Sequence, residues 1–463
     1  MTMYEVVIKN GKIITARETL EADLAIQNGK IHCVGSNLSG HQVIDATGLY
    51  VLPGAVDPHV HLQMPAGETT SSDNWATGTT AAAFGGTTTV IDFIEPTQDQ
   101  PLVEAFQERK AQADPQVVID YALHMTLSNI IPERMAELPA VIQAGITSFK
   151  AYTTYEGLKL TDQDFLEMFR QVSMSGGMVM VHAENDAICN FATRELLAQG
   201  QYGPNAHPFS RPAVAEGEAI ERVLAMASLT HTPVYIVHIS TALGAAALAH
   251  AQARGQRAFG ETCPQYLLLT DQEYSKPGFE GAKFVCAPPL RKKSDNAFLW
   301  NALSDNTIQT IGTDHCPFFF QGQKDLGKDR FTRIPGGIPG VEPRLALVYT
   351  YGVRTGRLTL NQWVDRCCTK PAELFGLYPR KGTLMPGADA DVVLFDPELE
   401  YTLTHEMLHE HVDYTPYEGF PLKGYPVMTL LRGEMIVNKG QLHARPGQGH
   451  YLKCDLPRFE RRV

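Results

Sequence analysis

Eight short apolar runs, separated by stretches of helical pattern, occupy the middle of the chain. A continuous apolar run of this length, bounded by turn residues, is typical of a strand buried on both faces, as in a parallel sheet. Helical patterns fill the gaps, for example at 75–86, 139–146 and 215–230. Strands that alternate with helices in this way predict an α/β fold with a (β/α)8 TIM-like barrel. The eight runs are 53–60, 88–93, 118–125, 147–152, 178–185, 233–240, 258–267 and 307–315.

Both ends of the chain carry a different pattern, in which apolar and polar positions alternate. Residues 4–52 alternate around two Asn-Gly pairs, at 10–11 and 28–29, and Asn-Gly between two such runs predicts a β-hairpin. The alternation returns at 390–396 and 427–442. Neither end can bury its apolar face alone, so we expect both to pair in one small β-sandwich beside the barrel. The predicted divisions are 1–52 for the first part of the sandwich, 53–380 for the barrel, and 381–463 for the second part of the sandwich and a tail.

The composition is that of a globular protein with a sizeable core, since 44% of the 463 residues are hydrophobic and 19% are charged. A net charge of −12 without a basic stripe disfavours nucleic acid as a partner. The eight cysteines form no CxxC pair, so we expect buried thiols and neither a disulfide framework nor a thiolate zinc site. The N-terminus lacks a charged head followed by an apolar core, and no apolar run of about 18 residues occurs. We therefore expect a cytoplasmic protein with no membrane partner.

Five of the apolar runs end in side chains that can bind a metal ion. In a barrel of parallel strands the carboxyl ends meet on one face, which is where active sites are built. His59 and His61 lie two apart, so on an extended strand both rings point the same way and can bind one ion together. Each motif alone is more often structural, and only the conjunction predicts a shared site. Its members are His59, His61, Lys150, His182, His238 and Asp314.

Lys150 is the unexpected member, because a buried strand would hold its ammonium in a medium of low dielectric without a partner. Either its stem lies along the barrel wall with an exposed head, or the lysine is chemically altered. A desolvated lysine can lose its proton and react with carbon dioxide, and the carbamate oxygens could then bridge two metal ions. Charge balance favours the carbamate, since an ammonium beside two divalent ions would be strongly repelled. Asp314 can bind metal, accept a proton or cap a turn, whereas His315 would point elsewhere.

In chain order, these residues and their neighbours resemble the cyclic amidohydrolases of the hydantoinase and dihydropyrimidinase group. The resemblance rests on HVH, SFKAY, VHAE, VHIS and GTDHCPF, and also on ETCPQYL, APPLR, IPGGIPGVEPR and KGTLMPGADADVVLFD. It covers nearly the whole chain. It implies hydrolysis of the cyclic amide C–N bond of hydantoins and dihydropyrimidines to N-carbamoyl amino acids, carried out by a homotetramer.

The same resemblance implies a site with two divalent ions, of which zinc is the expected metal. Asp314 is implied as a ligand of the first ion and as the shuttle that carries a proton from a metal-bridging hydroxide to the leaving nitrogen. The other implied ligands are His59 and His61 for the first ion, His182 and His238 for the second, and carboxylated Lys150 as the bridge.

The resemblance also assigns substrate contacts. Tyr155, five residues after Lys150, matches the tyrosine whose hydroxyl holds the substrate carbonyl and the developing oxyanion. Ala287 and Gly336 stand where the group has serine and asparagine, at positions that contact the ring amide mainly through the main chain. These two departures leave open which ring is preferred.

Three related classes remain alternatives: dihydroorotases, allantoinases and the non-catalytic collapsin-response scaffolds. A dihydroorotase needs an arginine after the HxH for its substrate carboxylate, whereas this chain has Leu62, Gln63 and Met64. The allantoinase-like EPGR stretch is absent, and the scaffolds have lost ligands that are all present here. The segments after the HxH and after Lys150 provide Leu62, Met64, Tyr152 and Tyr155, with no arginine among them. They predict an apolar and aromatic wall with few charged groups, which suits an uncharged ring with an apolar substituent.

Overall fold

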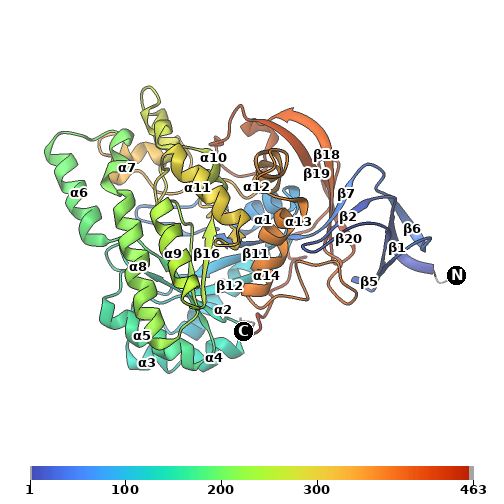
Figure 1. Cartoon of the computed structure of the whole chain (residues 1–463), viewed down its shortest axis with the longest axis horizontal. Helices are drawn as coiled ribbons and strands as arrows, with labels where there is room; N and C mark the ends of the chain where they lie inside the picture. The colour runs from blue at the N-terminus through green and yellow to red at the C-terminus, as the bar shows by residue number, and fades with distance from the viewer. Residues whose placement is uncertain (1–2, 458–463) are drawn as a thin grey trace.

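The computed structural model describes residues 3–457 and contains an eight-stranded parallel sheet that curves into a nearly closed barrel (Figure 1). Each strand pairs in parallel with the next one in chain order. Every predicted apolar run overlaps one of these strands, so the predicted barrel is confirmed. The strands are β8 (Ala55–Val60), β11 (Thr87–Ile94), β12 (Asp120–Thr126), β13 (Ser148–Tyr152), β14 (Met178–His182), β15 (Val234–Ile236), β16 (Ala258–Thr262) and β17 (Thr310–Ile311).

Helices connect the strands and cover the outside of the barrel (Figure 1). The three helical stretches predicted from the sequence correspond to α1, α4 and α8. Helix α1 begins where it does because the side chain of Asn74 accepts hydrogen bonds from the first free backbone N–H groups. No helix among the described residues is long and apolar enough to cross a membrane. The helices are α1 (Trp75–Phe84), α2 (Leu102–Ala113), α3 (Pro132–Met135), α4 (Leu138–Gln143), α5 (Asp162–Met174), α6 (Asp186–Ala198), α7 (His207–Ser210), α8 (Ala213–Thr230), α9 (Ala242–Ala253), α10 (Pro264–Leu268), α11 (Lys293–Ser304), α12 (Arg344–Val348), α13 (Leu360–Val364) and α14 (Lys370–Leu374).

The two chain ends form a β-sandwich beside the barrel, at the right of Figure 1. One sheet has the strand order β5-β4-β1-β6, and the other, β21-β20-β19-β18-β7-β2-β3, mixes strands from both ends. Ile8, Leu24, Val51 and Leu430 are among the side chains that fill the apolar space between the sheets. The predicted sandwich is confirmed, while its exact residue divisions stay a prediction. The strands are β1 (Met3–Lys9), β2 (Lys12–Ile14), β3 (Thr19–Glu21), β4 (Asp23–Gln27), β5 (Lys30–Gly35), β6 (Ser39–Asp45), β7 (Tyr50–Pro53), β18 (Val392–Thr402), β19 (Pro421–Leu431), β20 (Glu434–Asn438) and β21 (Gln441–Leu442).

Only one of the two predicted Asn-Gly hairpins forms. At the second pair, Asn28 (φ 52°) and Gly29 (φ 69°) are both left-handed, as a two-residue hairpin turn of this kind requires, and β4 pairs with β5. At the first pair only Asn10 is left-handed, and β1 and β2 belong to different sheets. The first hairpin prediction is wrong, because Gly11 is required for close packing and not for a hairpin turn. An added Cβ there would lie 2.5 Å from Val51 Cγ2, so glycine lets the chain cross closely between the sheets.

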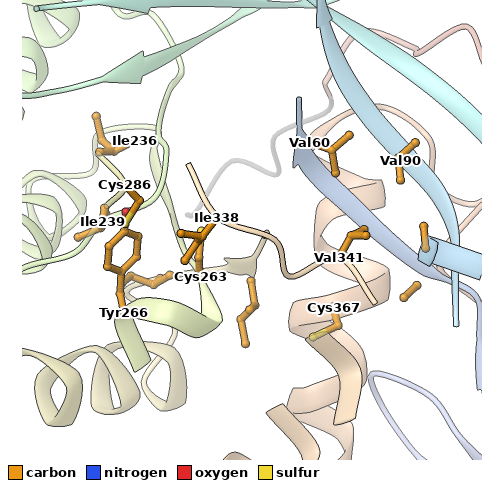
Figure 2. Packing of buried hydrophobic residues seen from close by; sticks show 14 of the residues in the cluster. Val60, Val90, Ile236, Ile239, Cys263, Tyr266, Cys286, Ile338, Val341 and Cys367 are labelled. Atoms are coloured by element: carbon orange, nitrogen blue, oxygen red, sulfur yellow. The ribbon is translucent and has the colours of Figure 1, made fainter. Parts of the chain in front are cut away.

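The core of the barrel is one large apolar cluster, part of which Figure 2 shows around Ile236, Cys286 and Ile338. As expected, all eight cysteines are free thiols, and seven of them are buried. The tail after the sandwich returns to the barrel. There Tyr121 of β12 accepts from Leu452 N at 2.7 Å and donates its own N–H to His450 O at 3.0 Å.

Candidate active site and metal centre

The first half of the site forms where the last barrel strand meets the first. Beyond β17 the chain continues alongside β8, with Asp314 N donating to His59 O (2.9 Å) and His61 N donating to His315 O (2.8 Å). This backbone pairing brings the two predicted histidines against the predicted aspartate. Asp314 Oδ1 lies 3.2 Å from the Nε2 atoms of both His59 and His61, and those two nitrogens are 3.2 Å apart. Among the described residues, this trio forms a group whose candidate ligand atoms lie within 4.8 Å of one another.

The second half of the site comes from β13, β14 and the segment after β15. Lys150 Nζ lies 3.5 Å from His59 Nε2. The ring of His238 stacks on that of His59, with centroids 5.4 Å apart, and lies 4.6 Å from the ring of His182. All six predicted ligands therefore converge on one spot. The strands are shorter than predicted, so His238 (φ 39°) and Asp314 (φ 53°) lie beyond their strands in left-handed turns.

Lys150 is buried without a counter-ion. Lys150 is only 1% exposed, so the alternative of an exposed head is wrong. In the part of the chain that the structure describes Lys150 forms no ion pair, and Nζ lies 4.8 Å from the centre of the Phe93 ring. Burial lowers the pKa of Lys150 to about 8, although Asp314, Glu261 and Glu95 oppose the shift. Lys150 therefore loses its proton more readily than an exposed lysine, and the unprotonated amine is the form that reacts with carbon dioxide.

Burial keeps three of the histidines neutral, and two buried glutamates that the sequence analysis did not select orient two of the rings. Burial lowers the pKa of His59, His182 and His238, and neutral imidazole is the form that binds metal. Glu261 Oε1 lies 2.6 Å from His59 Nδ1, which leaves Nε2 for the cluster. Glu184 Oε2 lies 2.8 Å from His182 Nε2, which leaves Nδ1. Carboxylates behind ligand histidines are the usual way to fix ring orientation in metal sites.

A signal for both glutamates was present in the sequence, although it was not used. Glu261 lies in ETCPQYL and Glu184 in VHAE, each at the end of a buried strand where an unpaired carboxylate would be strongly destabilising. Glu261 also accepts from His238 N at 3.0 Å and from the Tyr235 hydroxyl at 2.9 Å. It therefore connects ligands of both halves of the site.

Asp314 and His315 point in different directions, as predicted for His315. Burial raises the pKa of Asp314, but His59, His61 and Lys150 outweigh burial and lower it below its usual range. Asp314 is thus a carboxylate that can accept a proton. His315 Nε2 instead contacts Asp73 at 2.9 Å, and its Nδ1 accepts from Gly340 N at 3.1 Å.

A cavity of about 640 Å³ opens above the cluster and is lined by Lys150, His182, His238 and Asp314. Tyr155 lines it too, in a left-handed conformation (φ 77°) that is strained for a bulky residue and typical of functional sites. Its ring centroid lies 5.0 Å from that of His182.

The predicted substrate contacts Ala287 and Gly336 also line the cavity, as do Met64 and Tyr152. The prediction for Leu62 is wrong, because its side chain is buried in the core against Gly78.

The wall also contains charged groups that the sequence analysis did not select. Arg211, from the turn between α7 and α8, lines the cavity, and its guanidinium carbon lies 4.9 Å from the centre of the Tyr155 ring. It is paired with Glu184 at 3.0 Å, so its charge is already balanced inside the protein. A second charged group in the wall is Glu95, whose carboxylate accepts from the Tyr152 hydroxyl at 3.4 Å.

A parallel barrel with histidines and an acid at the carboxyl ends of its strands defines a class of metal-dependent hydrolases. Residues 50–436 match the Amidohydrolase family, and the chain belongs to this metal-dependent family.

Within it, the chain is 46% identical over 450 residues to a D-hydantoinase of Geobacillus stearothermophilus, with 96% of each chain covered. A crystal structure of a D-hydantoinase matches with a TM-score of 0.97 and 44% identity, over 98% of this chain and 99% of that one. A dihydropyrimidinase from Brevibacillus agri matches with a TM-score of 0.96 and 43% identity, over 97% and 98% of the two chains. The predicted membership of the hydantoinase and dihydropyrimidinase group, and with it a cyclic amide hydrolase, is confirmed.

Proposed function

We propose that this chain hydrolyses the C–N bond of a cyclic amide, in hydantoins and dihydropyrimidines, and releases the N-carbamoyl amino acid. The observation that carries the proposal is the buried Lys150 amine, 3.5 Å from His59 and without a counter-ion, at the centre of five other potential ligands. A scaffold protein would gain nothing from holding an unpaired lysine there, since burial of an unpaired ammonium is strongly unfavourable. The names of the relatives point to the same substrates.

The residues fit two divalent ions, for which we propose zinc. Imidazole and carboxylate are donors that zinc accepts, and the contact with Glu261 leaves His59 Nε2 beside His61 and Asp314. Lys150 lines the cavity, so its amine is accessible to carbon dioxide, and the resulting carbamate would provide the missing anionic bridge. We assign His59, His61 and Asp314 to one ion, His182 and His238 to the other, and carboxylated Lys150 to both.

When bound, such ions lower the pKa of coordinated water to near neutrality and polarise the amide carbonyl. Residues of the protein carry out the proton transfer and bind the substrate. Asp314, a carboxylate held at the cluster, takes the proton of the attacking water and delivers it to the ring nitrogen as the C–N bond breaks. The Tyr155 hydroxyl donates a hydrogen bond to the carbonyl oxygen as negative charge develops on it. Ala287 and Gly336 contact the ring amide.

The charges in the cavity wall favour an uncharged ring with an apolar substituent. A carboxylate-bearing ring such as dihydroorotate would meet the Glu95 carboxylate, and Arg211 could bind it only by giving up its contact with Glu184. Met64, Tyr152 and Tyr155 provide the apolar contact surface. We therefore propose aryl- or alkyl-substituted hydantoins and dihydropyrimidines as substrates and dihydroorotate as a poor one.

The test is a comparison of kcat/KM on protein whose metal content has been measured. Hydantoins with an apolar 5-substituent and dihydrouracil should be hydrolysed, with dihydroorotate and allantoin at least about tenfold slower, a difference of about 1.4 kcal/mol in transition-state binding. Preference for either of the latter two would refute the substrate assignment. Lys150→Ala tests the metal assignment, because full metal occupancy with normal turnover in this variant would rule out a bridging lysine.

We also propose a homotetramer in the cytoplasm, on the basis of the resemblance to the hydantoinase group. Light scattering coupled to size-exclusion chromatography measures the assembly directly, and a mass of one or two chains would contradict the proposed tetramer.

A further inference from the structure

A second buried lysine, Lys324, lies outside the metal cluster and next to the cavity. It begins the short 3-10 helix η4 (Lys324–Gly327), and none of its side chain is exposed. Within residues 3–457 it forms no ion pair. Its ammonium instead donates to two backbone carbonyls, Val285 O at 2.8 Å and Pro335 O at 3.0 Å. Burial lowers the pKa of Lys324 to about 7, which shows that the charged form of this lysine is destabilised where it lies.

The two carbonyls belong to the two segments that carry Ala287 and Gly336. Val285, Ala287, Gly336 and Gly337 all line the cavity. The segments are also joined directly, since Gly337 N donates to Val285 O at 3.0 Å. Lys324 therefore lies behind one wall of the cavity and connects its two halves.

Two residues of this wall have main-chain donors that are not used within the protein. Among the described residues, the main-chain N–H groups of Ala287 and Gly336 donate no hydrogen bond within the protein. Neither residue has a side chain that can adjust to a ligand, so the positions of these donors depend wholly on what holds the backbone. Free backbone N–H groups that face a cavity are suited to the carbonyl groups of a cyclic imide.

Other groups contact this wall on the side that faces the core, but they do not do what Lys324 does. His207 Nε2 contacts Cys286 O at 2.8 Å, and Cys286 and Ile338 pack into the apolar core that Figure 2 shows. At Gly337 (φ 154°) an added Cβ would lie 2.3 Å from Cys316 O, so there is no room for a side chain at this position. Of these groups, Lys324 contacts both segments at once.

We propose that Lys324 is a positioning residue for substrate recognition, which holds the Ala287 and Gly336 segments at the spacing that a ring amide requires. The proposal rests on the proposed function, because it names how that same site binds its ring. Lys324 touches none of the six metal-cluster residues, so its loss should weaken substrate binding and leave the metal content intact. A role in stability alone would lower the melting temperature without changing KM.

The test compares Lys324→Met, which keeps the apolar stem and removes the donors, with Lys328→Met. Lys328 lies on the same loop with its side chain 66% exposed, so it is a matched control. We expect Lys324→Met to raise KM for a hydantoin between about tenfold and a hundredfold, the range for a misplaced binding group, with kcat within about threefold. Lys324→Gln retains two N–H donors and should raise KM less than Lys324→Met.

Each result is decisive. Normal KM in folded, metal-loaded Lys324→Met overturns the proposal, as does a loss of kcat that follows a loss of metal. Failure of both Lys324 variants to fold would assign the lysine to fold maintenance and also overturn it. Turnover by the wild type and by Lys328→Met reports separately on the proposed function. Its absence there would refute the hydrolase assignment, whatever Lys324 does.

Discussion

Glu261 is the residue whose replacement tests the metal centre most directly without removing a proposed ligand. It is fully buried and accepts three hydrogen bonds, from His59 Nδ1, His238 N and the Tyr235 hydroxyl. Glu261→Ala removes all three hydrogen bonds at once. The His59 ring is then free to rotate, and the backbone N–H of His238 is left buried without a partner.

The glutamine variant separates the charge of Glu261 from its geometry. A glutamine oxygen in the place of Oε1 can still accept from His59 and His238. Its amide group would then face Tyr235, whose hydroxyl can turn to donate to Thr310 Oγ1, 2.6 Å away. Loss of a carboxylate behind a ligand histidine lowers metal affinity by about 10- to 100-fold, or about 1.4 to 2.8 kcal/mol. We expect Glu261→Gln near the lower limit and Glu261→Ala near the upper one.

The assay is zinc retention during equilibrium dialysis against a graded series of chelator concentrations, followed by kcat at saturating metal. Thr310→Val is the control, because it removes the partner of Tyr235 and leaves the contact to His59 intact. Its metal affinity should equal that of the wild type. Unchanged metal affinity in Glu261→Ala would refute the idea that this carboxylate organises the ligands.

The remaining predictions concern catalysis and stability. Asp314→Asn keeps the size and one ligand oxygen of the side chain but removes the proton acceptor. At full metal occupancy kcat should therefore fall at least about 100-fold. A variant with wild-type kcat would mean that another group carries the proton. Tyr155→Phe should lower kcat/KM by about 10- to 1,000-fold, as expected for one lost oxyanion donor, and an unchanged value would exclude that role. Lys381 contacts Asp120, Asp391 and Asp389 at 2.6, 2.7 and 3.0 Å, so Lys381→Met should lower the free energy of unfolding by about 3–5 kcal/mol in denaturant titrations. Burial raises the pKa of Asp389, but Lys381 and Lys30 outweigh burial and lower it. The stabilisation that ionised Asp389 contributes is therefore present above its unfolded pKa and is lost as the pH falls through its folded pKa. Lys381→Met should make the free energy of unfolding less dependent on acid.

The parts of this protein that could be predicted from the sequence are those set by local pattern. Each barrel strand overlaps a predicted apolar run, and His59, His61 and His182 lie within one residue of the carboxyl end of a strand, where parallel strands must converge. Glu261 could not be paired with His59 in this way, because the two are 202 residues apart and meet only across the closed barrel. Arg211 lines the cavity from the turn between α7 and α8, and no strand pattern in the sequence indicates such a position.

The errors have equally local causes. Asn10-Gly11 has the composition of a hairpin turn, but the glycine is required by close packing against Val51, which only the folded sandwich reveals. Leu62 follows directly after a ligand, yet the backbone turns so that its side chain enters the core.

The seam between β8 and the segment after β17 couples catalysis to the thermodynamics of folding. The contacts that join these segments are the same ones that bring Asp314 to His59 and His61, so an opened barrel has no complete first ligand set. An ion that binds only the closed state must therefore oppose opening of the seam, and each tenfold excess of free ion over its Kd adds about 1.4 kcal/mol to that resistance. The rate of hydrogen exchange at the amides of His61 and Asp314 should thus fall as metal concentration rises. That rate would report how much of the first metal site is occupied.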